Sequence, residues 1–96
     1  MYISNQASHV TYVKKTTVAN EEILRNKIKE LQPTWTNHSA RKITVSVKSE
    51  CLVLINGVDE ILITPEYGLS LDYSDIKIDT FTTITENVEL YMVISY

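Results

Sequence analysis

The sequence predicts a mainly β protein, an antiparallel β-sandwich of the jelly-roll or Ig-like kind, with an N-terminal extended arm and one short α-helix. Three observations predict it. Ile, Val and Thr occupy 31 of the 96 positions, and β-branched side chains favour strands. Short apolar segments recur from residue 43 to residue 96, with turn residues between them. No helical pattern separates these segments, which argues against a parallel α/β sheet.

The expected β-domain covers residues 43–96. Ile43 to Val47 alternates apolar and polar residues, as a strand with one buried face does. Cys51 to Ile55 is continuously apolar, which is typical of a central strand covered on both faces. Asn56-Gly57 predicts a tight hairpin, because both residues tolerate positive φ. Further strands are expected at 58–64, 69–73, 76–78 with a continuation to Phe81, and 88–96, and residues 65–68 are expected to form a turn.

Residues 1–42 are expected to form a separate N-terminal extension. Residues 1–18 carry only a weak strand pattern, at Val10, Tyr12 and Thr16 to Val18, and are predicted to be an extended arm with at most one strand. A helix is predicted over about residues 21–32, with Asn20 as its N-cap and Pro33 at its end. Such a short helix is marginal alone in water, so its apolar stripe needs a surface, either the protein's own sheet or a neighbour's. Residues 33–42 are the expected hinge between arm and body.

Charge is distributed unevenly along the chain. Residues 1–42 carry seven Lys and Arg against three Glu, a net +4, whereas residues 43–96 carry two Lys against nine Asp and Glu, a net −7. Two interpretations are open. Either solvated faces simply differ in charge, or the basic extension of one copy binds the acidic body of another copy or an acidic partner. The residues expected at such a protein interface are Tyr12, Lys14, Lys15, Leu24, Ile28, Leu31, Trp35, Arg41 and Lys42.

No motif for catalysis, a metal or a nucleotide stands out, and no cofactor is expected. Cys51 with His9 or His38 has the residue types of a thiol nucleophile and its base. However, Cys51 opens the most apolar strand, where a free cysteine behaves as a small hydrophobe. An acidic set provides oxygen ligands of the kind that calcium prefers, but its spacing matches no metal-binding loop. The set consists of Asp59, Glu60, Asp72, Asp75 and Asp79.

Several other features have an ordinary interpretation beside a functional one. The basic pairs Lys14-Lys15 and Arg41-Lys42 would have to converge with stacking aromatic residues to bind nucleic acid, and nucleic acid is not an expected partner. Trp35 is either a lid on the core edge or an anchor at a subunit interface. Four tyrosines are either core and rim residues or a platform for a sugar. They are Tyr67, Tyr73, Tyr91 and Tyr96. Asn37-His38-Ser39 matches the glycosylation pattern, and we interpret the match as chance.

The chain offers a single cysteine, no segment of membrane-spanning length and no basic region followed by an apolar run at its start. We therefore expect a protein made and folded in a cytoplasm, without a disulfide and without a membrane partner. A small domain without such a covalent staple has a modest core. Association with other copies or other proteins would add stability.

One family resemblance is carried by the C-terminal half. Val53-Leu54-Ile55-Asn56-Gly57, Ile61-Leu62-Ile63, Gly68 to Asp72, Asp75 to Ile78 and a closing Val88 to Tyr96 resemble small β-sandwich modules in virion proteins of tailed bacteriophages. The resemblance covers about 50 residues and excludes the N-terminal helix and basic arm. It implies a structural role, with no catalytic residues to transfer.

These observations lead to one expected function and one alternative. The expected function is a non-enzymatic bacteriophage virion protein, made in the host cytoplasm and assembled as a homo-oligomer with capsid or tail proteins. Head decoration, head-fibre anchoring and a neck or tail subunit are the roles considered. The alternative is a carbohydrate-binding module that recognises a cell-surface glycan through exposed tyrosines and Trp35.

Overall fold

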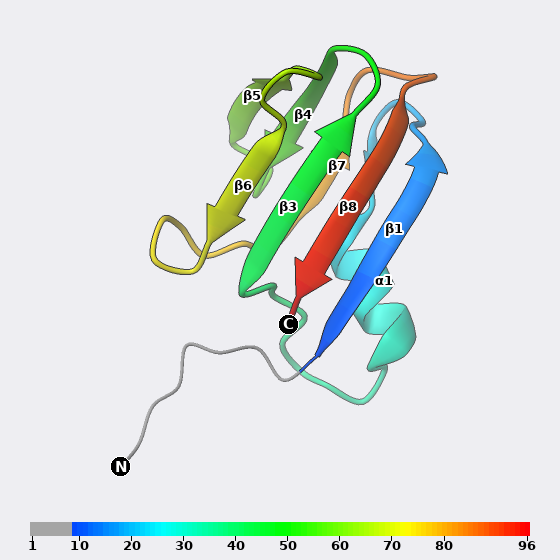
Figure 1. Ribbon diagram of the computed structural model, residues 1–96. Coiled ribbons are helices and arrows are strands. Elements are labelled where there is room, and N and C mark those ends of the chain that lie inside the picture. Colours follow the sequence, from blue (N-terminus) through cyan, green and yellow to red (C-terminus); the bar gives the residue numbers. More distant parts are fainter. Residues whose placement is uncertain (1–8) are drawn as a thin grey trace.

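The computed structural model describes residues 9–96, which form two antiparallel sheets of four strands each (Figure 1). The first eight residues of the expected arm lie outside the described residues. The first sheet has the order β1 (Val10–Thr16), β8 (Glu89–Ser95), β3 (Lys42–Val47) and β6 (Leu69–Asp72). The second has the order β2 (Glu21–Glu22), β7 (Phe81–Thr83), β4 (Cys51–Ile55) and β5 (Asp59–Ile63). The expected mainly β, antiparallel architecture is confirmed.

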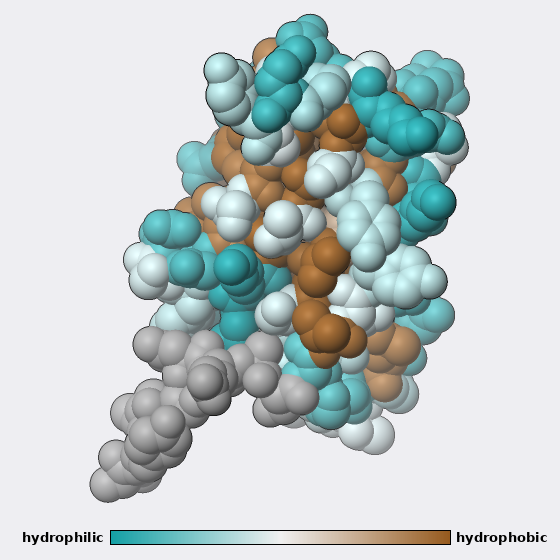
Figure 2. Space-filling view, viewed as in Figure 1, coloured by the Kyte–Doolittle hydropathy of each residue, from teal (hydrophilic) through white to brown (hydrophobic). Residues whose placement is uncertain are grey.

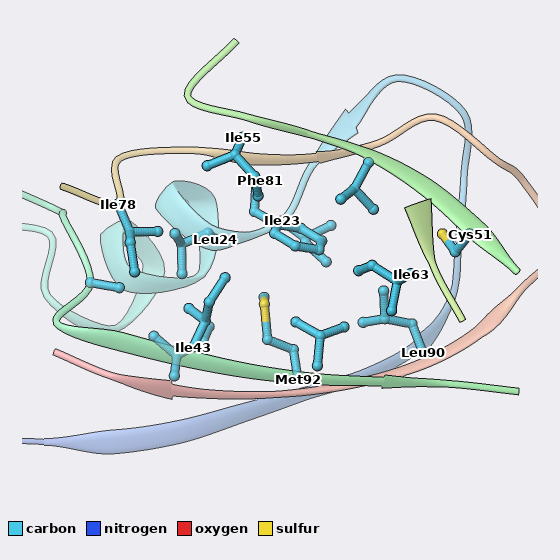
Figure 3. Packing of buried hydrophobic residues seen from close by; sticks show 14 of the residues in the cluster. Ile23, Leu24, Ile43, Cys51, Ile55, Ile63, Ile78, Phe81, Leu90 and Met92 are labelled. Atoms are coloured by element: carbon cyan, nitrogen blue, oxygen red, sulfur yellow. The ribbon is translucent and has the colours of Figure 1, made fainter. Parts of the chain in front are cut away.

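The core lies between the inner faces of the two sheets (Figure 3). Alternation decides which side chains reach it, because successive residues of a strand point to opposite faces. β3, for example, alternates exposed and buried residues along its whole length. The fully buried side chains of both sheets include Ile43, Val45, Met92 and Ile94 from the first, and Val53, Ile55, Ile63 and Phe81 from the second. Each such side chain stabilises the fold by about 1.5–3 kcal/mol relative to exposure.

Most strands expected in residues 43–96 form within a residue or two of their predicted bounds. The segment 76–78 differs, because it forms no strand and makes only an isolated bridge between Ile78 and Ala40. The chain re-enters a sheet at β7 instead. The Asn56-Gly57 turn is confirmed, since both residues have positive φ and the Val58 N–H donates to the Ile55 carbonyl at 3.1 Å.

The helix is shorter than expected and begins later. α1 spans Leu24–Leu31, and Asn20 is a turn residue with φ of 61° rather than the N-cap. The two residues after Asn20 form β2, which pairs with β7. The first helical N–H groups are satisfied by the Glu22 carboxylate, which accepts from Leu24, Arg25 and Asn26 at 2.8–3.0 Å. A strand residue therefore caps the helix that follows it.

Residues 9–42 differ from the expected separate extension, because they complete the same two-layer fold. All seven residues of β1 pair with β8 (Figure 1). Leu24 and Ile28 of α1 are fully buried in the shared core, so the apolar stripe rests on the protein's own sheets. The helix lies behind β1 and β8, in the layer of the second sheet, where β2 is too short to cover them (Figure 1).

The expected hinge at 33–42 is also tied to the body. Trp35 packs against the core, and the Ala40 N–H donates to the Ile78 carbonyl at 2.9 Å. The Ser39 hydroxyl donates to the Asp79 carboxylate. Removing residues 1–18 would therefore delete an edge strand of the fold and not a detachable arm.

Two glycines give a matched pair of stability predictions. Gly68 has φ of +62°, and a Cβ built on it would lie 2.6 Å from the Val45 carbonyl oxygen of β3. Gly57 has φ of +72°, but a Cβ there would have no atom within 4 Å. Gly57→Ala should therefore lower the free energy of unfolding by about 1–2 kcal/mol, which is the cost of holding an alanine in the left-handed conformation. Gly68→Ala should cost more, about 3 kcal/mol or above, because the strand must also move. Urea unfolding of both variants checks this, and equal losses would contradict it.

Candidate functional site

β1, with seven residues, is the longest of the four strands that end a sheet in the described fold. It ends the first sheet, and within residues 9–96 no strand pairs with its outer side. The N–H groups of His9 and Tyr96 each donate to the other's carbonyl at 2.9 Å. Because such reciprocal pairs alternate in an antiparallel ladder, the odd residues of β1 bond β8. The N–H and C=O groups of Val10, Tyr12, Lys14 and Thr16 consequently face away from the sheet.

The outer side chains of β1 are also exposed. Val10 and Tyr12 are 68% and 58% exposed, and Lys14 lies on the same face. The Tyr12 ring stacks on Tyr91 of β8, with centroids 5.8 Å apart. Figure 2 shows that apolar and intermediate residues occupy much of the centre of this sheet face, with hydrophilic residues toward its rim. An exposed edge strand with apolar side chains is the kind of strand to which another chain can add.

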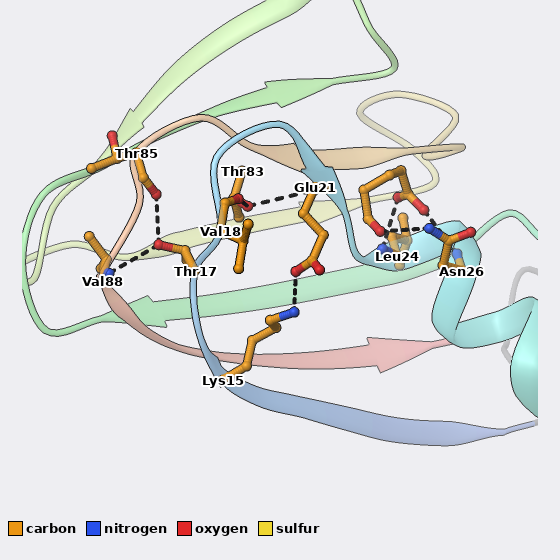
Figure 4. Close-up of polar contacts among 10 residues, drawn as sticks. Lys15, Thr17, Val18, Glu21, Leu24, Asn26, Thr83, Thr85 and Val88 are labelled. Atoms are coloured by element: carbon orange, nitrogen blue, oxygen red, sulfur yellow. Dashed lines mark hydrogen bonds and ion pairs between the residues drawn. The ribbon is translucent and has the colours of Figure 1, made fainter.

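An open groove of about 530 Å³ separates β1 from β2 and α1. Its lining carries both charges, with Lys14 and Lys15 on the β1 side and Glu21, Lys27 and Glu30 on the side of β2 and α1. An ion pair between Lys15 and Glu21 crosses it (Figure 4). The groove is therefore an electrically mixed cleft, partly closed by its own side chains, and its lining residues include no Ser, Cys or His.

Two buried threonines fix the turn that follows β1 (Figure 4). The Thr17 hydroxyl donates to the Thr85 carbonyl at 2.6 Å and accepts from the Val88 N–H at 3.0 Å. The Thr83 hydroxyl donates to the Val18 carbonyl at 2.8 Å. These bonds hold the end of β1 against the β7–β8 connection, so the free edge is presented by a fixed strand.

The residues expected at an interface fall into three groups. Tyr12, Lys14 and Lys15 lie together on β1, whereas Leu24 and Ile28 are buried and unavailable to a partner. The others are dispersed on the protein's own surface. Leu31 is 40% exposed, Trp35 contacts the rings of His9 and Tyr96, Arg41 lies 5.0 Å from the Tyr73 ring centroid, and Lys42 is exposed on β3.

Trp35 packs at the edge of the core, beside Tyr96. The four tyrosines are not in contact with one another, since none of the ring contacts in residues 9–96 joins two of Tyr67, Tyr73, Tyr91 and Tyr96. Tyr96 is buried, and Tyr73 is engaged with Arg41. Tyr67 is 91% exposed in the turn between β5 and β6.

Two members of the acidic set, Asp72 and Asp75, form hydrogen bonds within one local turn. The Asp72 carboxylate accepts from the Ser74 N–H and the Asp75 carboxylate accepts from the Asp72 N–H, at 2.8 and 3.1 Å. Hydrogen bonds from the Ser74 hydroxyl and N–H lower the pKa of Asp72, and Lys42 adds to this effect. Asp79 accepts from Ser39. In residues 9–96 no three His, Cys, Asp or Glu side chains are grouped to hold a metal ion.

Cys51 is fully buried at the start of β4. Burial raises the pKa of its thiol above the ordinary 9.0, because desolvation disfavours the thiolate. The thiol should therefore react with iodoacetamide far more slowly in the folded protein than in urea, and comparable rates would contradict this. Since the folded pKa is raised, the thiol's contribution to stability is complete below pH 9 and declines as the pH rises through the folded pKa. Cys51→Ala should reduce that decline.

Two features of the structure were not expected from the sequence. Glu22 was assigned to the first turn of a helix, but its carboxylate joins β2, α1 and β7, accepting from the Phe81 N–H at 2.8 Å. β5 was expected as a hairpin strand, but not as the end of its sheet. Its exposed residues are Asp59, Glu60 and Leu62. A Glu two residues before an apolar helix stripe is the only local signal that could have indicated the cap.

Searches against protein-family models, curated proteins and solved structures found no match to this chain. Among residues 9–96, no helix has the length and hydrophobicity needed to cross a membrane. The candidate site is therefore described from its geometry alone. It consists of β1, a basic and partly apolar edge strand, and the charged groove beside it.

Proposed function

We propose that the two-layer fold is a β-sandwich of the jelly-roll type. The pairings β1 with β8, β2 with β7, β3 with β6 and β4 with β5 describe one long hairpin. Successive pairs of this hairpin fall alternately in the two sheets, giving the orders 1-8-3-6 and 2-7-4-5. An Ig-like sandwich has a different arrangement of strands in its two sheets. Jelly rolls are built from eight strands in two sheets and occur in viral capsid and lectin domains.

The proposed function is that of a non-enzymatic structural subunit of a bacteriophage virion, assembled in several copies with capsid or tail proteins. Because a fold hosts many functions, the proposal rests on the site and not on the strand order. The observation that carries it is the free edge of β1, seven regular residues long with exposed Val10 and Tyr12. An uncovered edge of this kind risks uncontrolled aggregation, and a specific partner removes that risk. The resemblance of residues 53–96 to phage virion modules supplies the context.

The direct test is the location of the chain in cells that carry its gene. Phage particles released from such cells are purified by density gradient, and the chain is quantified in the particle fraction by mass spectrometry, with an abundant cytosolic enzyme as the contamination control. We expect the chain to be enriched with the major capsid protein. If the chain remains with the cytosolic enzyme and is absent from particles, the proposed function is wrong.

Glycan binding remains the alternative, but the geometry favours it less. Its expected aromatic residues are dispersed, with Trp35 packed on the core edge and Tyr67 alone in a turn. Signal on a glycan array that is lost on Tyr67→Ala or Trp35→Ala would favour this alternative over assembly.

A further inference from the structure

The edge of β5 has the opposite character to the edge of β1. β5 ends the second sheet, and Glu60 and Leu62 are exposed on its outer face. Its N-terminal residues Asp59 and Glu60 are acidic, whereas β1 carries Lys14 and Lys15. Among the ion pairs of residues 9–96, none involves Lys14 or Glu60.

The hydrogen-bonding groups of β5 can be assigned from its neighbours. The Asn56 N–H donates to Thr80 and the Ile84 N–H to Leu52, so the even residues of β4 bond β7. The odd residues of β4 therefore bond β5, and their partners on β5 are also odd. It follows that the N–H and C=O groups of Glu60 and Leu62 face away from β4, toward solvent.

The geometry points to β5 of a second copy of this chain as the occupant of the free edge of β1. This inference rests on the proposed assembly function, and it names the contact between copies. In an antiparallel alignment that places Lys14 opposite Glu60, Tyr12 falls opposite Leu62. Both pairs join residues whose backbone groups face outward, so the ladder hydrogen bonds can form at these positions.

The same alignment matches the side chains on both faces. On the outer face it places a lysine opposite a glutamate and a tyrosine opposite a leucine, and such pairs stabilise sheets. On the inner face it places Val13 opposite Ile61 and Lys15 opposite Asp59. Core-facing residues thus meet core-facing residues, and no residue has to change faces.

The charges also argue against the symmetric alternative. If two β1 strands paired with each other through Tyr12 and Lys14, four lysines would gather along one short seam. Like charges on neighbouring strands are destabilising. A β1–β5 contact is head to tail, so each copy in a row keeps one free edge for the next copy, which forms a chain or closes a ring. Repetition of one small subunit is what an assembly of many copies requires.

A charge exchange tests the contact. The apparent dissociation constant for self-association of the full chain is measured by sedimentation velocity at low salt. Lys14→Glu and Glu60→Lys should each weaken association about fivefold, because an attractive pair becomes a repulsive one. The double variant should return to within about twofold of the unaltered chain. Glu50→Lys, at an exposed site in the β3–β4 turn, makes the same charge change as Glu60→Lys and should have little effect.

Three outcomes overturn the inference. One is a double variant no stronger than either single variant. Another is a loss of association with Lys14→Glu but not with Glu60→Lys, which assigns the β1 edge to a different occupant. The third is a chain that stays monomeric at every concentration. None of these removes the proposed function if the chain is found in purified particles, and absence from particles removes the function whatever the self-association shows.

Discussion

Replacing Ile28 with Ala is expected to lower the free energy of unfolding by about 3 kcal/mol. Ile28 is fully buried between α1 and the sheets, and deletion of large buried aliphatic side chains costs about 2–5 kcal/mol. In a domain of this size such a loss lowers the melting temperature by more than 10 °C, at about 4–8 °C per kcal/mol. Urea unfolding followed by circular dichroism measures the effect in the isolated protein, without any partner.

Leu31→Ala is the matched control, because Leu31 belongs to the same apolar stripe but is 40% exposed. We expect a loss of less than about 1 kcal/mol there. A large loss at Ile28 with a small one at Leu31 means that the helix stabilises its own domain. Small and nearly equal losses of unfolding free energy in the two variants would contradict the structure. They would indicate instead that the helix docks on a partner.

Glu22→Ala is expected to cost about 2–4 kcal/mol. The Glu22 carboxylate accepts hydrogen bonds from three N–H groups at the start of α1 and from the Phe81 N–H of β7. Loss of a helix cap costs about 0.5–2 kcal/mol, and a buried N–H left without a partner costs about 1–3 kcal/mol more. The side chain therefore contributes both to the helix and to its junction with the second sheet.

Two further variants separate the role of the carboxylate from that of its charge. Glu22→Gln keeps one acceptor oxygen and should retain part of the stability, so its loss should lie between zero and that of Glu22→Ala. Glu21→Ala removes the adjacent carboxylate, which bonds only the partly exposed Lys15, and should cost about 1 kcal/mol or less. The assignment fails if Glu21→Ala proves as damaging as Glu22→Ala.

The strands of residues 43–96 could be predicted because each has a local signature. Alternation marks β3, uninterrupted apolar runs mark β4 and the middle of β8, and Asn56-Gly57 marks the hairpin. β1 lacks such a signature. Its core-facing row is Thr11, Val13 and Lys15, with one apolar residue in three, so the pattern showed no buried face. Its place in the sheet comes from pairing with β8, about eighty residues later in the chain.

The helix start could not be predicted for a similar reason. Asn20 and the two glutamates have the local form of a helix N-terminus. Pairing of Glu21 and Glu22 with β7 outweighs that preference and moves the first helical residue to Leu24. The bond from the Phe81 N–H to Glu22 joins residues 59 positions apart, which no local pattern can indicate.

Of the candidate site, the sequence named Tyr12, Lys14 and Lys15 among the expected interface residues, and the structure places all three on β1. The sequence was a poorer guide to how these residues are used. The opposite net charges of residues 1–42 and 43–96 suggested a basic arm that binds an acidic body. The structure interleaves those halves, and the relevant contrast is between two sheet edges, basic β1 and acidic β5. Which strands end a sheet depends on the whole topology, so that contrast emerges only in the fold.

The central claim is that the outer edge of β1 is the assembly contact, and amide hydrogen exchange tests it most directly. Exchange is measured at single-residue resolution in dilute protein and in the assembled state. The N–H groups of Tyr12 and Lys14 should exchange much more slowly once the chain assembles, while those of Thr11 and Val13, already bonded to β8, should change little. Assembly that leaves the Tyr12 and Lys14 amides as fast as in the dilute protein would contradict the claim.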